Sequence, residues 1–342
     1  MDVTYNLNSL VSRLAEPGAR TRDQVARLSE ALASGRVDDA GKALRHDFSA
    51  LSRAERDLAL HDSLRHSVEA GRRLVGMAGT SADRIAIEID ALREAFKPSI
   101  TGGAYPDVAI AARATEEGLR AILSALDVVV DGRSVFGGGR ADAPAIDGAQ
   151  AVMDDLAGLY VPGMNEADLR AAVADYFAAP VPPAAPAAGT FLGDRVPAGA
   201  PDAVSIRLGD EGATRWAVSV DDPAILSILS EVGQAYALGA TPDLAETDAT
   251  RDFYATAMPA KVATALDAAI DLRARIGTLE SRLDAAADRL DADRFDALGR
   301  RDALIGADPY ETATRLEAET ARLETVYTLT ARLSRLRLTD YL

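Results

Sequence analysis

The 342-residue chain contains no cysteine, which excludes disulfides, zinc–thiolate sites and thiol nucleophiles together. Aromatic residues make up only 5% of the sequence, with one tryptophan, Trp216. No apolar run approaches the roughly 20 residues of a membrane-spanning helix, and the opening residues lack the basic and apolar regions of a cleavable secretory signal. We therefore expect no membrane span, and export by another route if the protein leaves the cell.

Positive charge is scarce and is carried almost entirely by arginine. Lysine occurs only at Lys42, Lys97 and Lys261, and the net charge is −16 at pH 7. This balance argues against nucleic acid as a partner, because the phosphates would be repelled by the protein as a whole. The abundant alanine, leucine, arginine and glutamate favour long helices and coiled coils. The expected fold is mainly α, with a long coiled-coil-like helical rod formed by the N- and C-terminal regions.

Residues 308–342 predict one capped amphipathic helix. Asp308 suits the N-cap, Pro309 the first helical position, and the Glu311 carboxylate could reach back to the cap. The apolar stripe of this helix consists of Leu323, Val326, Leu329, Leu333 and Leu336. A stripe of this length needs a partner, which must be the N-terminal segment or another copy of the protein.

A heptad pattern in residues 4–35 predicts the first partner. Its apolar members, which we assign to an assembly interface together with the C-terminal stripe, are Leu7, Val11, Leu14, Val25, Leu28 and Leu32. Pro17 and Gly18 interrupt the pattern, so we expect a kink or break there. Residues 34–42 then form a connector. Because the two stripes are narrow, we expect neighbouring copies to cover their remaining faces.

The middle of the chain alternates long helical patterns with short strand patterns. Helices are expected near 48–96, 106–129, 148–158, 165–178, 223–236 and 259–298. Gly76 and Gly79 could loosen the first of these. One hairpin should be centred on Asp131 and Gly132, because an Asp-Gly pair favours a tight turn. A second should join strands Val204–Leu208 and Arg215–Val220.

These patterns predict three domains. Two of them each combine a segment that precedes residues 148–252 with a segment that follows them. Residues 1–44 with 309–342 form a terminal helical domain, and residues 45–147 with 253–308 form a helical rod domain with the hairpin near 131–147. Residues 148–252 form a small inserted α+β outer domain.

No catalytic, cofactor or metal site is predicted. His61 and His66 are five residues apart on an expected helix, so their side chains do not converge on one metal ion. The glycines from Gly132 resemble the start of a phosphate loop, but Gly138 and Gly139 stand where lysine and serine or threonine are needed. We therefore expect a protein that is not an enzyme.

Three segments resemble bacterial flagellins and flagellar hook-associated proteins. VARLSEALASGRVDDAGKAL resembles the N-terminal segment of that family, and ETARLETVYTLTARLSRLRLTDYL resembles its C-terminal helix. VVVDGRSVFGGGRADAP is similar to the Gly-x-x-Leu-Phe-Gly-Gly turn, with Val135 in place of the usual leucine. The chain closes with Tyr-Leu and lacks an Ile-Asn-Thr-Asn opening. In both respects it is most like the junction branch of the family, hook-associated protein 3.

The resemblance implies a structural protein that is exported through the flagellar type III channel without a cleavable signal peptide. It would sit outside the cell, joining hook to filament as a homo-oligomer, with its terminal helices in an inner tube and its long helices in the next layer. Implied partners are copies of itself, other hook-associated proteins, flagellin and an export chaperone. Residues 1–40 and 310–342 would be largely disordered before assembly. There are two alternatives to the junction role: a filament flagellin, and a surface-binding module in residues 148–252.

Overall fold

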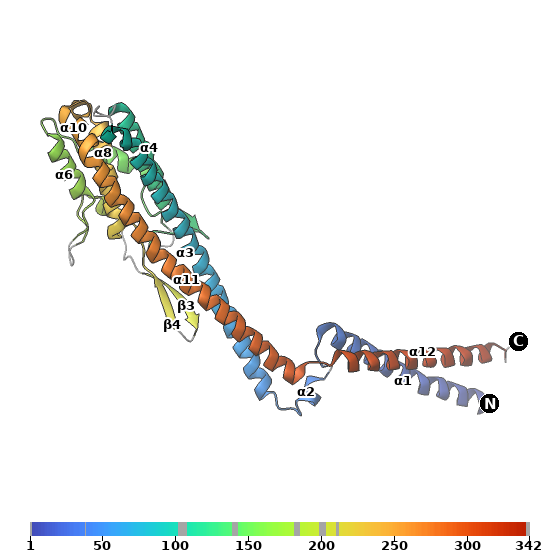
Figure 1. Ribbon diagram of the computed structural model, residues 1–342. Helices are drawn as coiled ribbons and strands as arrows, with labels where there is room; N and C mark the ends of the chain where they lie inside the picture. The colour runs from blue at the N-terminus through green and yellow to red at the C-terminus, as the bar shows by residue number, and fades with distance from the viewer. Residues whose placement is uncertain are drawn as a thin grey trace. The chain divides into compact units, whose positions relative to one another are not determined.

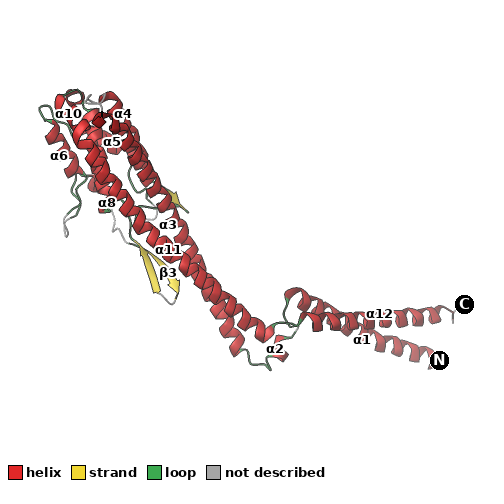
Figure 2. Ribbon diagram, in the orientation of Figure 1, coloured by secondary structure: helices red, strands yellow, loops and turns green. Residues whose placement is uncertain are grey.

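The computed structural model describes residues 2–37, 39–101, 108–138, 143–180, 185–197, 203–209 and 212–339. Long helices dominate, and two small antiparallel hairpins accompany them (Figures 1 and 2). The mainly α fold class with an inserted β-hairpin is therefore confirmed. The chain divides into two compact units: unit 1 is Met1–Ser63 with Asp291–Leu342, and unit 2 is Leu64–Leu290.

Unit 1 contains the two terminal helices, α1 (Asp2–Ser34) and α12 (Pro309–Thr339), which pack side by side and antiparallel (Figure 1). The predicted break at Pro17 is wrong, because α1 runs through this residue as one helix. The fixed φ of proline is compatible with a helix, although the ring removes one hydrogen bond and crowds the carbonyl four residues earlier. The neighbouring Gly18 lies close to α12, because a Cβ at this position would be 3.2 Å from Cγ1 of Val326.

The connectors at the base of the helix pair are joined through their backbones. Gly35, with φ of 66°, ends α1 in the left-handed conformation that glycine favours. The Val37 N–H donates to the Ile305 carbonyl at 2.8 Å, and the Ala307 N–H donates to the Gly35 carbonyl at 2.9 Å. We call residues 35–37 with 305–307 the connector clasp. It joins the residues that follow the end of α1 to those that precede the start of α12.

The remaining long helices are α3 (Ser49–Thr101) and α11 (Met258–Ile305). Helix α3 is continuous through both of the glycines that were expected to loosen it. Helix α10 (Asp248–Asp252) and the π-helical turn η1 (Phe253–Ala257) lead directly into α11. Ion pairs link α3 to α11 in each unit: Arg294 to Asp62 at 2.8 Å in unit 1, and Arg273 to Asp83 at 2.9 Å in unit 2.

In unit 2, α4 (Val108–Leu126) is followed by β1 (Val129–Val130) and β2 (Arg133–Ser134). The turn between these strands consists of Asp131 and Gly132, with φ of 51° and 76°. Two positive φ values are typical of the type I′ turn that matches the twist of a two-residue hairpin. The hairpin predicted from the Asp-Gly pair is confirmed.

The second hairpin pairs β3 (Val204–Gly209) with β4 (Gly212–Trp216). The prediction of a strand over Arg215–Val220 is wrong, since β4 starts earlier and ends at Trp216. Tertiary contacts explain the difference. The Trp216 indole N–H donates to the Val135 carbonyl at 2.9 Å, and the Val220 N–H donates to the Phe136 carbonyl at 3.0 Å. The chain after Trp216 therefore binds to the segment that follows β2 and does not extend the ladder.

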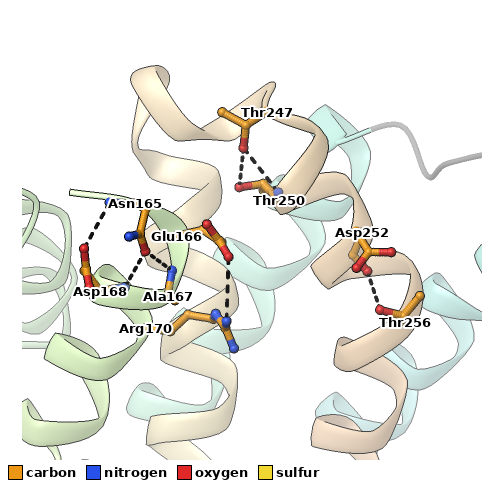
Figure 3. Close-up of polar contacts among 9 residues, drawn as sticks. All are labelled: Asn165, Glu166, Ala167, Asp168, Arg170, Thr247, Thr250, Asp252 and Thr256. Carbon is orange, nitrogen blue, oxygen red and sulfur yellow. Dashed lines mark hydrogen bonds and ion pairs between the residues drawn. The ribbon is translucent and has the colours of Figure 1, made fainter. Parts of the chain in front are cut away.

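The other elements of unit 2 are α5 (Ala149–Gly158), α6 (Glu166–Tyr176), α7 (Phe191–Asp194), α8 (Pro223–Ala240) and α9 (Pro242–Ala245). Side-chain caps fix the starts of α6, α7 and α8, and Figure 3 shows the cap of α6 together with that of α10. Asn165 Oδ1 accepts from the N–H groups of Ala167 at 2.8 Å and Asp168 at 2.9 Å, forming a capping box at α6. Thr247 Oγ1 accepts from the Thr250 N–H at 3.2 Å at the start of α10.

One large apolar core fills unit 2, with α8 packed against α4 and α6. Its largest fully buried side chains are Trp216, Tyr254, Phe96, Phe136, Phe177 and Phe191. The Phe96 and Tyr254 rings stack with their centroids 5.8 Å apart. Burial of these aromatic rings stabilises the fold of unit 2.

Candidate assembly surface

Helix α12 begins at the predicted cap. Asp308 Oδ1 accepts from the Tyr310 N–H at 2.9 Å and the Glu311 N–H at 3.0 Å, so its role as N-cap is confirmed. The predicted return of the Glu311 carboxylate to the cap is wrong. It instead accepts from Nη2 of Arg315, one turn further on, at 2.6 Å. An i, i+4 ion pair on a solvated face competes well with the capping box when arginine is within reach.

A heptad seam on α12 faces inward where α1 packs. It consists of buried Thr312 and half-buried Leu316, Glu319, Leu323 and Val326. The spacings of 4, 3, 4 and 3 are those of a coiled-coil seam. Val326 lies against Gly18 of α1, and the absence of a side chain on the glycine allows the two helices to approach closely. Only Leu323 and Val326 of the predicted stripe belong to this seam.

The stripe does not stay on this seam. Its spacings of 3, 3, 4 and 3 fall short of the 3.6 residues of a helical turn, so the stripe rotates around the helix. At about 100° per residue, Leu329 lies about 120° around the helix from Leu323, and it is 45% exposed. Leu333 and Leu336 lie on α12, but their side chains are outside the described part of the chain. The stripe therefore begins as an internal contact, and its next member, Leu329, is exposed.

The predicted α1 residues divide in a similar way. Leu28 is buried and Val25 half-buried, as the heptad predicts for a seam. Near the end of the helix the pattern fails, because Ala31 is buried while Leu32 stays 39% exposed. The side chains of the other three predicted interface residues are outside the described part of the chain; they are Leu7, Val11 and Leu14.

Polar contacts across the helix pair were not predicted from the sequence. Arg22 of α1 donates from Nε at 3.2 Å and from Nη2 at 2.9 Å to the Tyr327 hydroxyl of α12. The guanidinium carbon lies 5.9 Å from the centre of the same ring, which adds a cation–π attraction. Neither residue belongs to a recognisable motif, so only the antiparallel register brings them together.

Unit 1 has a thin core and many exposed apolar side chains. Its buried hydrophobic residues among the described side chains are Leu28, Ala31, Leu51, Ala54, Ala297 and Ile305. Its exposed large hydrophobic side chains are those of Leu32, Phe48, Leu60, Phe295, Tyr310, Tyr327 and Leu329. Half of the buried group are alanines, which contribute little apolar area. The pairing of α1 with α12 therefore leaves much of the apolar surface of unit 1 without cover.

Among the described residues, no group of three or more histidine, aspartate or glutamate residues is arranged to hold a metal ion. None of the helices in this part of the chain is long and apolar enough to cross a membrane. The exposed apolar side chains of unit 1, Leu329 among them, are the feature that most calls for a functional explanation.

Comparison with known protein families finds one match at the C-terminal end. Residues 260–342 match the family model described as the bacterial flagellin C-terminal helical region, which covers most of α11 and all of α12. A search of curated proteins found no match.

Among solved structures, one from Vibrio parahaemolyticus, described as a flagellar hook-associated protein, has a similar fold. Its sequence is 12% identical, the TM-score is 0.50, and the match covers 74% of this chain and 95% of that one. The family match and the shared fold support the resemblance to flagellins and hook-associated proteins.

Proposed function

We propose that this chain is a structural, non-enzymatic subunit of the bacterial flagellum that polymerises through α1 and α12. One observation carries the proposal. Residues 260–342, which match the flagellin C-terminal region, contain the helix on which Leu329 of the apolar stripe turns away from α1 and is 45% exposed. A stripe that only another polypeptide can cover is typical of an assembling subunit.

Association would stabilise the terminal helices by burying this surface. Each Å² of apolar area removed from water contributes about 25 cal/mol, which offsets the entropy lost when the helices are ordered. The seam between α1 and α12 fixes their register, and the face of α12 that carries Leu329 and, seven residues further on, Leu336 meets neighbouring copies. The predicted interface thus acts in two parts, one within the chain and one between chains.

We further propose that the subunit joins hook to filament. In this assignment residues 1–44 with 309–342 form the inner tube, residues 45–147 with 253–308 form the surrounding rod layer, and residues 148–252 form the outer domain. The protein would lie outside the cell, after type III export without a cleavable signal and with the help of a chaperone. Other hook-associated proteins and flagellin would be its neighbours. A filament flagellin is the alternative, and labelling intact flagella distinguishes a short zone from a long polymer.

Replacing Leu329 or Leu333 by aspartate tests the assembly surface. Either change places a charge in the stripe, so we expect incorporation into flagella to be lost. The fold should change little for Leu329→Asp, since substitutions at exposed positions usually alter stability by less than about 0.5 kcal/mol. Incorporation is measured by microscopy of labelled protein in the source bacterium, and folding of unit 2 by the emission of Trp216.

Ile110→Asp is the matched control, because Ile110 is 66% exposed on α4 in unit 2, outside the terminal helices. It should be incorporated as the unmodified protein is. Normal flagella containing the Leu329→Asp and Leu333→Asp proteins would refute the proposed role of the stripe.

A further inference from the structure

Charge is segregated along α12. Residues 309–326 carry four acidic side chains and two arginines, whereas residues 327–339 carry Arg332, Arg335 and Arg337 and no acid. The helix macrodipole favours acids at a helix start, but its effect falls off within the first turn. It therefore does not account for Glu317 and Glu324, which lie well inside the helix.

Glu317 and Glu324 are left free for an external partner. Both are exposed, and neither forms an ion pair with any of the residues that the structure describes. The other two acids are already matched: Glu311 pairs with Arg315 at 2.6 Å and Glu319 with Arg322 at 3.7 Å. The acidic half of the helix thus presents two unmatched carboxylates to solvent.

The two unmatched acids share one face of α12 with one of the distal arginines, Arg335. Glu317 and Glu324 are seven residues apart, and Arg335 lies eighteen residues, or five full turns, beyond Glu317. This face lies about 140° around the helix from the α1 seam and also carries Tyr310, which is 84% exposed. Eighteen residues at 1.5 Å each separate the acidic and basic positions by about 27 Å.

We propose that neighbouring copies pack side by side and parallel, displaced along α12 by about 27 Å, so that Arg335 of one copy lies level with Glu317 of the next. The partner is a second copy because one helix carries both complementary halves at a fixed spacing. The inference rests on the proposed function and adds the axial offset between subunits. The apolar stripe supplies the adhesion, and the charges set the register.

Cross-linking tests the offset in the full chain. The protein has no cysteine, so Glu317→Cys with Arg335→Cys introduces the only two thiols. They are about 27 Å apart within one helix, far beyond the roughly 4.4–6.8 Å between Cα atoms that a disulfide spans, so any disulfide must join two copies. We expect a ladder of reducible multimers under oxidising conditions.

The control pair is Glu317→Cys with Arg337→Cys, since position 337 lies about 160° around the helix from position 317. It should give several-fold less multimer. If the unmodified protein associates but the first pair cross-links no better than the control, the offset is wrong while the proposed function stands. If the unmodified protein does not associate at all, both are wrong.

Charge reversal gives an independent test. Glu317→Arg with Glu324→Arg makes both halves of α12 basic, and Arg332→Glu with Arg335→Glu makes both acidic. Each variant alone should need roughly tenfold more protein for half-maximal assembly, measured by sedimentation. An equimolar mixture should recover assembly, because each variant then meets its complement. Unimpaired assembly of the single variants, or a mixture no better than either, would overturn the proposal.

Discussion

At the residue scale, the role of a glycine depends on what lies opposite it. Gly18 appears in the sequence as a weak point in a heptad, yet it is where α1 approaches Val326 of α12 most closely. In α8, a Cβ on Gly239 would lie 2.5 Å from the Ala112 Cβ and 2.8 Å from the Tyr254 hydroxyl. Gly76 in α3 has no atom within 4 Å of such a Cβ. The three positions are indistinguishable by helix propensity alone.

Alanine substitutions at two of these glycines should have opposite effects. Gly239→Ala should lower the free energy of unfolding by about 1–3 kcal/mol, because overpacking at the α4–α8 contact outweighs the gain in helix propensity. Gly76→Ala should raise it by about 0.5–1 kcal/mol, since only the propensity term remains. Denaturant unfolding followed by Trp216 emission measures both. Equal effects of the same sign would mean that the close approach at Gly239 does not limit packing.

At the scale of elements, single carboxylates tie helices together. The Asp222 side chain caps α8 by accepting from the Ala224 N–H at 3.0 Å and also accepts two hydrogen bonds from Arg275 of α11, both at 2.8 Å. Asp155 of α5 accepts from Arg195 Nε at 2.6 Å and from the Tyr176 hydroxyl of α6 at 2.7 Å. Each of these contacts orders elements that lie far apart in the chain.

The Asp155 contacts should give unit 2 an acid-sensitive component. Hydrogen bonding from Arg195, with a further bond from Tyr176, lowers the pKa of Asp155 below its usual value of 3.8. A lowered pKa stabilises the fold above the unfolded pKa, and this stability is lost as the pH falls through the folded pKa. Asp155→Asn should therefore lower the free energy of unfolding by roughly 1–2 kcal/mol near neutral pH, and the difference should shrink below about pH 4. Urea titrations from pH 7 to 3 measure it; a difference independent of pH would contradict the assignment.

Local signals in the sequence predicted elements well, and long-range contacts account for the failures. The caps at Asp222 and Asp308 and the turn at Asp131 depend on neighbouring residues, so their residue types suffice. The strand beyond Trp216 was misplaced because its hydrogen bonds go to residues some eighty positions earlier. Leu323 and Val326 of the predicted α12 stripe lie on the seam with α1, but the position of Leu329 away from that seam becomes clear only when the register of the two helices is known.

At the scale of the whole molecule, core and charge are divided unequally between the two units. Unit 1 has 17 basic and 20 acidic side chains, a net charge of −3, whereas unit 2 has 20 and 33, a net charge of −13. Nearly neutral surfaces pack closely without mutual repulsion, and a strongly acidic region discourages nonspecific association. The unit proposed to assemble is thus the one with little net charge and a thin core.

This division predicts that the terminal helices of an isolated monomer unfold before unit 2. Residues 16–34 and 309–332 are held mainly by one narrow seam, so their amides should exchange rapidly, whereas those of α4 and α8 should be protected close to the global limit. On heating, helical circular dichroism should fall before the emission of Trp216, which is only 1% exposed in unit 2, begins to change. A matched measurement on assembled protein should show both terminal segments protected, because the stripe is then covered. Strong protection of α1 and α12 in a verified monomer would show that the seam alone suffices to order them, and that assembly is not needed to complete their fold.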